Sequence, residues 1–347
     1  RLDEYFYGGD EADNSLAAIM KQLAITAVYN PPGTNTPDVV TSQTGRVFVA
    51  QTPETFQYDD DGNLTRDGRF TYTWDAENRL ISATTRADLP ASVPRIRVEY
   101  TYDHQSRRIA SATAVRTNGT WQAVESRAFL YDGWNVIAET IQNQQSQITN
   151  HYVWGLDLSG SLQGAGGIGG LLSASLDGTT AFYCYDANGN VGQLVSPDGD
   201  LLAHYEYSPF GETIVSTGPL AKANPFRFST KHWDNLTGLG YWGYRWYNPE
   251  NGRWLSRDPI GEEGGHNIYA FVLNDSINWV DDTGLRRRRG DRDRRRGNLA
   301  GAHRFIWHFY TGGGAPVDIG AWGYLGHYRS ARDVQRFECE ARNEARA

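Results

Sequence analysis

The chain reads IRVEYTYDHQSRRI over residues 96–109, and this stretch contains both signals that decide its fold. Residues 96–102 alternate apolar or aromatic with polar side chains, which is typical of a β-strand with one buried face. The pair Tyr102-Asp103 then opens a short polar segment that ends at an apolar residue. Asp, Asn and Gly favour tight turns because they tolerate left-handed backbone or bond to their own main chain. The stretch therefore predicts a strand followed by a hairpin tip.

The same phrase of aromatic residue, acidic residue, turn and apolar residue returns along the chain. Each copy predicts a hairpin tip, and residues 69–74 and 239–247 alternate as further strands. The interval between the last two strong copies is close to twice the two intervals before it. These features predict a mostly β fold, an antiparallel sheet that grows strand by strand. The strong copies occupy residues 58–64, 74–80, 102–109, 131–137 and 185–191, with weaker echoes at 207–211 and 247–252.

The composition changes sharply after Leu285. Residues 286–347 hold 14 Arg, no Lys and 7 acidic residues, a net charge of +7, whereas the whole chain carries −8, which leaves −15 for residues 1–285. Such opposite charges indicate an acidic body and a basic tail. The Arg-rich stretch 286–296 is compatible with a solvated linker or with binding to nucleic acid or an anionic membrane. The rest of the tail predicts a small α+β unit that includes a short amphipathic helix over residues 330–341.

Several common classes of protein are excluded or disfavoured. No run of about 18 apolar residues could form a membrane-spanning helix, and the two cysteines, Cys184 and Cys339, allow at most one disulfide. The segment GAGGIG at residues 164–169 matches a dinucleotide-binding pattern, but strand-like residues follow it, so we expect a Gly-rich hairpin or a closely approached strand. No cofactor or metal site is predicted. The absence of a starting Met suggests a fragment of a longer chain.

Two acidic residues beside the compositional border are the candidate catalytic pair. Asp258 lies in RDPIG at residues 257–261, and Asp281 lies further along the chain in DDTGL at residues 281–285. Amide hydrolysis needs one ionised carboxylate to activate water and one protonated carboxylate to assist the carbonyl, and neighbouring carboxylates push their pKa values apart. Both segments also favour turns, so the alternative is that the two residues only shape the backbone.

The chain resembles an Rhs-family protein in its tyrosine-aspartate (YD) repeats and in two further segments. These are residues 245–261, RWYNPENGRWLSRDPIG, and residues 267–272, NIYAFV, which resemble the RHS repeat-associated core. The resemblance covers residues 56–285. Members of the family include Rhs polymorphic toxins of secretion systems and the C components of bacterial Tc toxins. The resemblance implies a hollow β-cocoon shell that holds a C-terminal toxin.

The resemblance also implies that the shell cleaves itself. In the family, two Asp-Pro-x-Gly-like phrases form an aspartyl autoproteolytic site, and they map onto Asp258 and Asp281, with the scissile bond between Leu285 and Arg286. This chain departs from the family pattern at Asp282, where proline is usual, and this substitution puts cleavage competence in doubt.

Two further residues are secondary candidates for the site. They are Asp234 and Arg257, the second of which could keep Asp258 ionised. For each, the alternative is a turn residue or a surface ion pair.

These inferences define a domain scheme and two functional hypotheses. The first hypothesis is a self-processing shell that is exported to the cell surface or medium. Its expected partners are its own cargo, missing N-terminal shell or delivery components and an immunity protein. The basic tail could also bind nucleic acid. The second is a non-catalytic surface protein whose repeats serve adhesion or carbohydrate binding, which exposed aromatic residues would favour. The scheme assigns residues 1–55 to a partial N-terminal shell segment, 56–238 to the YD-repeat shell, 239–285 to the core with the cleavage motif and 286–347 to the variable cargo.

Overall fold

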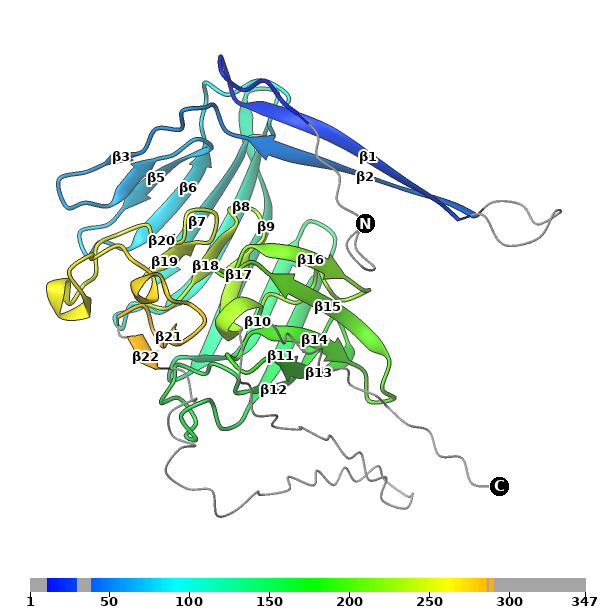
Figure 1. Cartoon of the computed structure of the whole chain (residues 1–347), viewed down its shortest axis with the longest axis vertical. Helices are drawn as coiled ribbons and strands as arrows, with labels where there is room; N and C mark the ends of the chain where they lie inside the picture. Colours follow the sequence, from blue (N-terminus) through cyan, green and yellow to red (C-terminus); the bar gives the residue numbers. More distant parts are fainter. Residues whose placement is uncertain (1–10, 30–38, 286, 290–347) are drawn as a thin grey trace, which may run out of the picture. The chain divides into compact units, whose positions relative to one another are not determined.

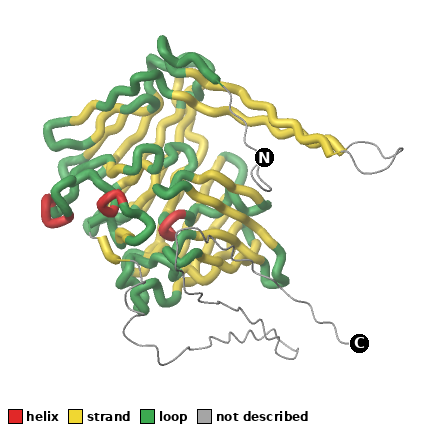
Figure 2. The backbone as a smooth tube through the Cα atoms, viewed as in Figure 1, coloured by secondary structure: helices red, strands yellow, loops and turns green. Residues whose placement is uncertain are grey.

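The computed structural model describes residues 11–29, 39–285 and 287–289, and over these ranges the fold is mostly β, as predicted. Figure 1 and Figure 2 show that strands dominate and that the helices are short. The predicted α+β tail and its helix lie outside the described residues. The strands of the described ranges are β1 (Ile19–Tyr29), β2 (Val39–Val49), β3 (Gln57–Tyr58), β4 (Leu64–Arg66), β5 (Phe70–Trp74), β6 (Leu80–Thr85), β7 (Ile96–Tyr102), β8 (Arg108–Thr117), β9 (Thr120–Asp132), β10 (Asn135–Asn143), β11 (Gln147–Trp154), β12 (Leu171–Leu176), β13 (Thr179–Tyr185), β14 (Val191–Val195), β15 (Leu201–Tyr207), β16 (Thr213–Thr217), β17 (His232–Asp234), β18 (Leu239–Tyr241), β19 (Trp246–Asn248), β20 (Arg253–Trp254), β21 (Trp279–Asp281) and β22 (Arg287–Arg289), and the 3-10 helices are η1 (Phe228–Thr230), η2 (Gly261–Gly264) and η3 (Val272–Asn274).

A 14-stranded antiparallel sheet contains β3 to β16 in strict sequence order. Each strand pairs with its neighbour in the chain, so the colours in Figure 1 change progressively from β3 to β16. Strands β17 to β20 form a separate four-stranded sheet, and β1–β2 and β21–β22 are two-stranded antiparallel sheets. This is the strand-by-strand growth that the repeats predict.

In four of the five strong YD repeats the aspartate closes its own hairpin tip. Asp103 accepts hydrogen bonds through Oδ1 from the backbone N–H groups of Gln105 (2.8 Å) and Arg107 (2.9 Å). The fifth residue of the phrase adopts a left-handed backbone, as at Ser106 with φ of 64°. Asp75 and Asp186 repeat these bonds two and four residues ahead, so the aspartate acts as a built-in turn former.

In several repeats the aromatic residue ties its hairpin to the preceding one. Tyr102 donates its hydroxyl to the carbonyl of Leu80 (2.7 Å), the last residue of the previous tip, and Tyr131 donates to the carbonyl of Arg108 (2.9 Å). The same contact joins Trp74 to Leu64 and Tyr207 to Val191. The ring packs against its neighbours, which sets the spacing of the repeats, and its polar end bonds to the main chain, which sets their register. One side chain therefore fixes both.

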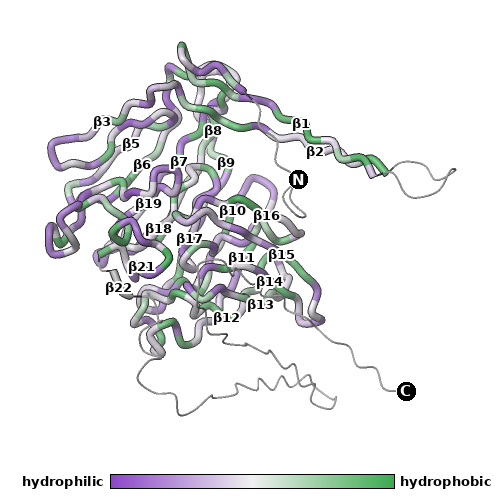
Figure 3. Tube along the Cα trace, in the orientation of Figure 1, coloured by the Kyte–Doolittle hydropathy of each residue, from purple (hydrophilic) through white to green (hydrophobic). Residues whose placement is uncertain are grey.

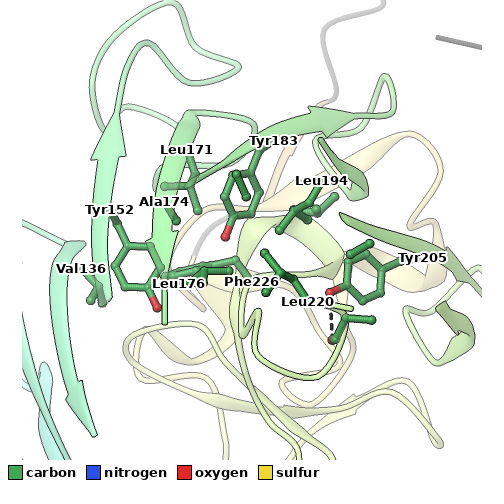
Figure 4. Close-up of a cluster of buried hydrophobic side chains, with 14 of the residues drawn as sticks. Val136, Tyr152, Leu171, Ala174, Leu176, Tyr183, Leu194, Tyr205, Leu220 and Phe226 are labelled. Atoms are coloured by element: carbon green, nitrogen blue, oxygen red, sulfur yellow. Dashed lines mark hydrogen bonds between the residues drawn. The ribbon is translucent and has the colours of Figure 1, made fainter. Parts of the chain in front are cut away.

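Buried side chains on one face of the large sheet form two clusters, and the second sheet covers one of them. Residues of β5 to β7 pack with Leu239, Tyr241 and Trp246 of the four-stranded sheet. Strands β9 to β15 pack with a segment that follows β16, and Figure 4 shows Tyr152 and Tyr183 beside Phe226 in this cluster. Figure 3 shows hydrophobic and hydrophilic residues interspersed along the strands. No helix among the described residues is long and apolar enough to cross a membrane.

The prediction of one continuous strand over residues 239–247 is wrong. The segment forms β18 and β19 with a turn between them, because Gly243 has φ of +99°, a conformation that only glycine adopts readily. The predicted strand over residues 69–74 begins one residue later, at Phe70, and the one over residues 96–102 has the predicted bounds. The proposed boundary between residues 238 and 239 lies inside the β17–β18 hairpin, and residues 19–49 contribute the separate β1–β2 pair.

Replacing Tyr102 by Phe tests the bond between repeats. The hydroxyl also accepts the indole N–H of Trp246 (2.9 Å), so its loss leaves two buried polar groups without this partner. We expect the free energy of unfolding to fall by about 1–3 kcal/mol, measured by urea denaturation of the full chain. Tyr244→Phe is the matched control, because Tyr244 is exposed and keeps its ring contact with Trp134, and it should change stability by less than about 0.5 kcal/mol. Equal effects of the two substitutions would contradict this role of the tyrosine hydroxyl.

Candidate functional site

Asp258 and Asp281 lie at one buried cation. Asp258 follows β20 and Asp281 ends β21, and both side chains are buried. The Nη2 atom of Arg245 lies 2.8 Å from Oδ2 of Asp258 and 3.7 Å from Oδ2 of Asp281. Two acids from separate segments of the chain therefore share one guanidinium group.

The turn that breaks the predicted strand presents Arg245 to this site. The turn is closed by a hydrogen bond from the N–H of Trp242 to the carbonyl of Arg245 (3.0 Å). The guanidinium group lies over the ring of Trp254, 4.2 Å from its centroid, and Nη1 donates to the carbonyl of Ile268 (3.2 Å). Only 2 % of the Arg245 side chain is exposed, so this charge is compensated by the two acids and by main-chain carbonyls.

The strand that leads to the predicted scissile bond is held along its main chain. Asp281 accepts the N–H groups of Thr283 (3.2 Å) and Gly284 (2.6 Å) through its own Oδ1. Four consecutive carbonyls are bound by side-chain or main-chain donors from residues 231–245. The pairs are Trp242 Nε1 with Asp281 O (3.0 Å), Lys231 Nζ with Asp282 O (2.6 Å), Tyr244 N with Thr283 O (3.1 Å) and Arg245 Nε with Gly284 O.

Leu285 follows this held segment and is half-buried. Arg286, the predicted residue on the other side of the bond, lies outside the described residues. The chain returns as β22, in which Arg287 is the register partner of Asp281. The Leu285–Arg286 bond therefore lies in the chain between β21, which ends in a candidate acid, and β22.

Burial sets the protonation of the pair. It raises the pKa of Asp281 to about 6, and the neighbouring Asp282 raises it too, while Arg245, Lys231 and the N–H of Gly284 oppose the rise. Burial also raises the pKa of Asp258, against the opposing effect of Arg245. Because Asp258 makes the shorter contact with the cation, we assign the ionised form to Asp258 and the proton to Asp281. One base and one acid in a water-poor site are the groups that amide hydrolysis requires.

The two secondary candidates have other contacts. Asp234 accepts the hydroxyl of Tyr100 (2.6 Å) and the N–H of Leu236, so it shapes the β17–β18 turn. Arg257 is exposed and donates to the carbonyl of Asp60 (3.3 Å). The cation that contacts Asp258 is Arg245 rather than Arg257.

Arg245 and Lys231 are site residues that sequence reasoning missed. Arg245 had a usable signal, since it is the only charged residue of the aromatic segment 239–247. A lone charge among residues destined for burial needs a partner of opposite charge. Lys231 had no comparable signal, because it lies among polar residues between two short elements.

Comparisons with known proteins agree with this architecture. The Teneurin YD-shell family profile matches residues 24–269. The chain is 34 % identical to the tRNA3(Ser)-specific nuclease WapA of Bacillus spizizenii over 239 residues, which cover 67 % of this chain and 9 % of that protein. It is 31 % identical to the toxin protein Tse5 of Pseudomonas aeruginosa over 255 residues, 66 % of this chain and 18 % of that one. The chain thus spans less than a fifth of the length of these relatives.

A solved structure has the same fold. The crystal structure of TcdB2-TccC3 superposes with a TM-score of 0.50 at 18 % identity, and the match covers 77 % of this chain and 16 % of that one. The repeats, the sheet in sequence order and the covering core define the class as a YD-repeat β-shell. The chain belongs to the Rhs/YD-shell family, as its repeats predict.

Removing the shared cation tests the electrostatics of the site. Arg245→Met leaves two buried carboxylates without their cation, so we expect a loss of about 3–5 kcal/mol in the free energy of unfolding at pH 8. The loss should shrink toward pH 5, because without Arg245 the pKa of both acids rises further, so a larger fraction of each is neutral at the lower pH and less charge is buried. Urea denaturation at the two pH values measures it.

The exposed Arg257 provides the matched control. Arg257→Met should cost less than about 0.5 kcal/mol at either pH. A pH-independent loss for Arg245→Met would mean that the arginine acts through packing alone.

Proposed function

We propose that the chain is the closing part of an Rhs-type shell that releases the residues after Leu285 by aspartyl self-cleavage. The single observation that carries this proposal is the shared contact of Asp258 and Asp281 with Arg245, beside the segment 281–285 that leads to the predicted scissile bond. The relatives include proteins named as a nuclease and a toxin, which supports assigning residues 286–347 to a toxin cargo. Export, an immunity protein and nucleic-acid binding by the basic tail belong to the same proposal.

The chemistry follows from the protonation of the pair. Asp258, held ionised by Arg245, takes a proton from a water molecule, and the oxygen of that water attacks the carbonyl carbon of Leu285. Asp281 gives its proton to the carbonyl oxygen as the tetrahedral intermediate forms. On collapse, the proton on Asp258 passes to the nitrogen of Arg286, the C–N bond breaks, and the hydroxyl proton returns to Asp281. The products are a carboxyl group on Leu285 and an amine on Arg286.

The held main chain supports the same mechanism. Arg245 bonds to the carbonyl of Gly284, one residue before the scissile bond, with the guanidinium group that also contacts both acids. Substrate and catalytic groups are thus tied to one rigid turn, and such fixed orientation lowers the barrier to reaction. Asp282, which replaces the usual proline, still has its carbonyl held by Lys231, so the strand keeps an anchor at the position of the departure.

The inward packing of the tryptophans argues against the adhesion hypothesis, although Phe56, Tyr58 and Tyr244 are exposed. Within residues 39–285 every tryptophan is buried or half-buried. Tyr241, Trp242 and Trp246 all belong to buried clusters of the four-stranded sheet. Aromatic platforms for sugars require exposed rings, which these are not.

Cleavage is testable by mass spectrometry. We expect the expressed full chain to split after Leu285, and Asp258→Asn and Asp281→Asn each to reduce the split by at least about 10³-fold, since each removes a proton-transfer group. Asp234→Asn is the control and should leave the cleavage intact, because Asp234 contacts Tyr100 and its own turn. An intact wild-type chain would contradict the proposed self-cleavage.

The pH dependence of cleavage should follow Asp281. Its proton is required, and its pKa is raised to about 6, so the rate should fall about tenfold for each pH unit above that value. At low pH the rate should fall again as Asp258 takes up a proton. Time courses of fragment formation in buffers from pH 4 to 9 measure both limbs, and a rate that rises steadily toward pH 9 would contradict this assignment of acid and base.

A further inference from the structure

The Gly-rich loop between β11 and β12 contacts the strand that carries the candidate cleavage site. Asp157 shapes the loop, since its Oδ2 accepts the N–H groups of Ala165 (2.6 Å) and Gly167 (3.1 Å). At Gly166, with φ of +61°, an added Cβ would lie 1.9 Å from the carbonyl oxygen of Asp282. Only glycine permits this approach of the two main chains, as expected for a closely approached segment.

Lys231 joins these two segments. Its side chain comes from the residue before β17, and the residue is 7 % exposed. Nζ donates to the carbonyl of Gly166 (2.8 Å) and to the carbonyl of Asp282 (2.6 Å). The group borders a cavity of about 40 Å³ that Trp242 and Thr283 also line, enough for at least one water molecule.

We propose that Lys231 is a positioning residue of the cleavage site, which fixes the strand before Leu285 to the Gly-rich loop and places a positive charge beside Asp281. This inference rests on the proposed self-cleavage. Lys231 does not touch the scissile bond. It acts through the carbonyl of Asp282 and through the charge of the neighbouring acid.

The charges around the ammonium group support this role. Asp281, Asp282 and Asp157 face it and favour its charged form, whereas burial lowers the pKa of Lys231 to about 8. Lys231 is therefore charged over most of the range in which Asp281 carries its proton. In turn Asp281 is faced by Lys231 and Arg245, which lower its pKa, and by Asp282, which raises it, while Asp258 contacts the same Arg245.

The test compares Lys231→Met with Lys231→Arg in the full chain. Each variant is made by cell-free synthesis and diluted into buffers from pH 5 to 9. The fragment that ends at Leu285 is followed by mass spectrometry, and near-UV circular dichroism checks folding.

Lys231→Met should slow cleavage by on the order of 10–100-fold, because the segment before Leu285 loses its anchor. In Lys231→Met the pH above which the cleavage rate falls (the alkaline limb) should also increase by about one unit, since loss of a nearby positive charge raises the pKa of Asp281. Lys231→Arg should keep the limb in place.

The possible outcomes distinguish failure of the role of Lys231 from failure of the proposed self-cleavage. If the wild-type chain does not cleave, the proposed function fails and the role of Lys231 falls with it. If the wild-type chain cleaves and a folded Lys231→Met variant keeps its rate and its alkaline limb, only the role of Lys231 is overturned. A slower rate with an unmoved limb overturns the electrostatic part and leaves the anchoring.

Two glycines give a second test that does not alter Lys231. Gly166→Ala and Gly160→Ala both place a side chain at positive φ in the same loop, but nothing lies within 4 Å of a Cβ at Gly160. Backbone strain is therefore similar, and only Gly166→Ala pushes on Asp282. We expect Gly166→Ala to slow cleavage by at least about tenfold relative to Gly160→Ala. Equal rates would overturn the coupling between loop and strand, even if Lys231→Met fails to fold.

Discussion

The hydrogen bond from the aromatic side chain of a repeat to a main-chain carbonyl of the preceding tip is the contact on which the rest of the molecule depends. It sets the spacing of the strands at Tyr102 and Leu80 and again at Tyr131 and Arg108. A sheet built in this way has one buried face that must be covered, and the four-stranded sheet covers part of it. The hydroxyl of Tyr102 also accepts the indole of Trp246, so the same bond links the repeats to the turn that carries Arg245.

That turn concentrates a large electrostatic cost at one point. The guanidinium group of Arg245 and the carboxylates of Asp258 and Asp281 are buried together, with the ammonium group of Lys231 beside Asp281, and desolvation of such charges is expensive. The raised pKa of Asp281 is the physical response, because burial favours the neutral form of a carboxyl group.

Much of the fold could be predicted because its signals are local. A tyrosine-aspartate tip carries its own turn former and its own strand residues, so Asp75, Asp103 and Asp186 behave as their neighbours in sequence require. The break at Gly243 could not be seen in the alternation of residues 239–247, because a single positive φ reverses the chain without disturbing the pattern. The juxtaposition of Asp258 and Asp281 was expected from family resemblance and from their chemistry. The lone charge of Arg245 in an aromatic segment indicates that it needs a partner, but the partners of Arg245 and Lys231 lie far along the chain, and no local pattern identifies them.

The row of donors on the carbonyls of residues 281–284 has a consequence for turnover. These bonds lie on the side of the Leu285–Arg286 bond that remains part of the shell. Under the proposed hydrolysis the new chain end would keep these bonds and stay beside the two acids. A site blocked in this way by its own product would act once, on its own chain, and would be a poor protease for other polypeptides.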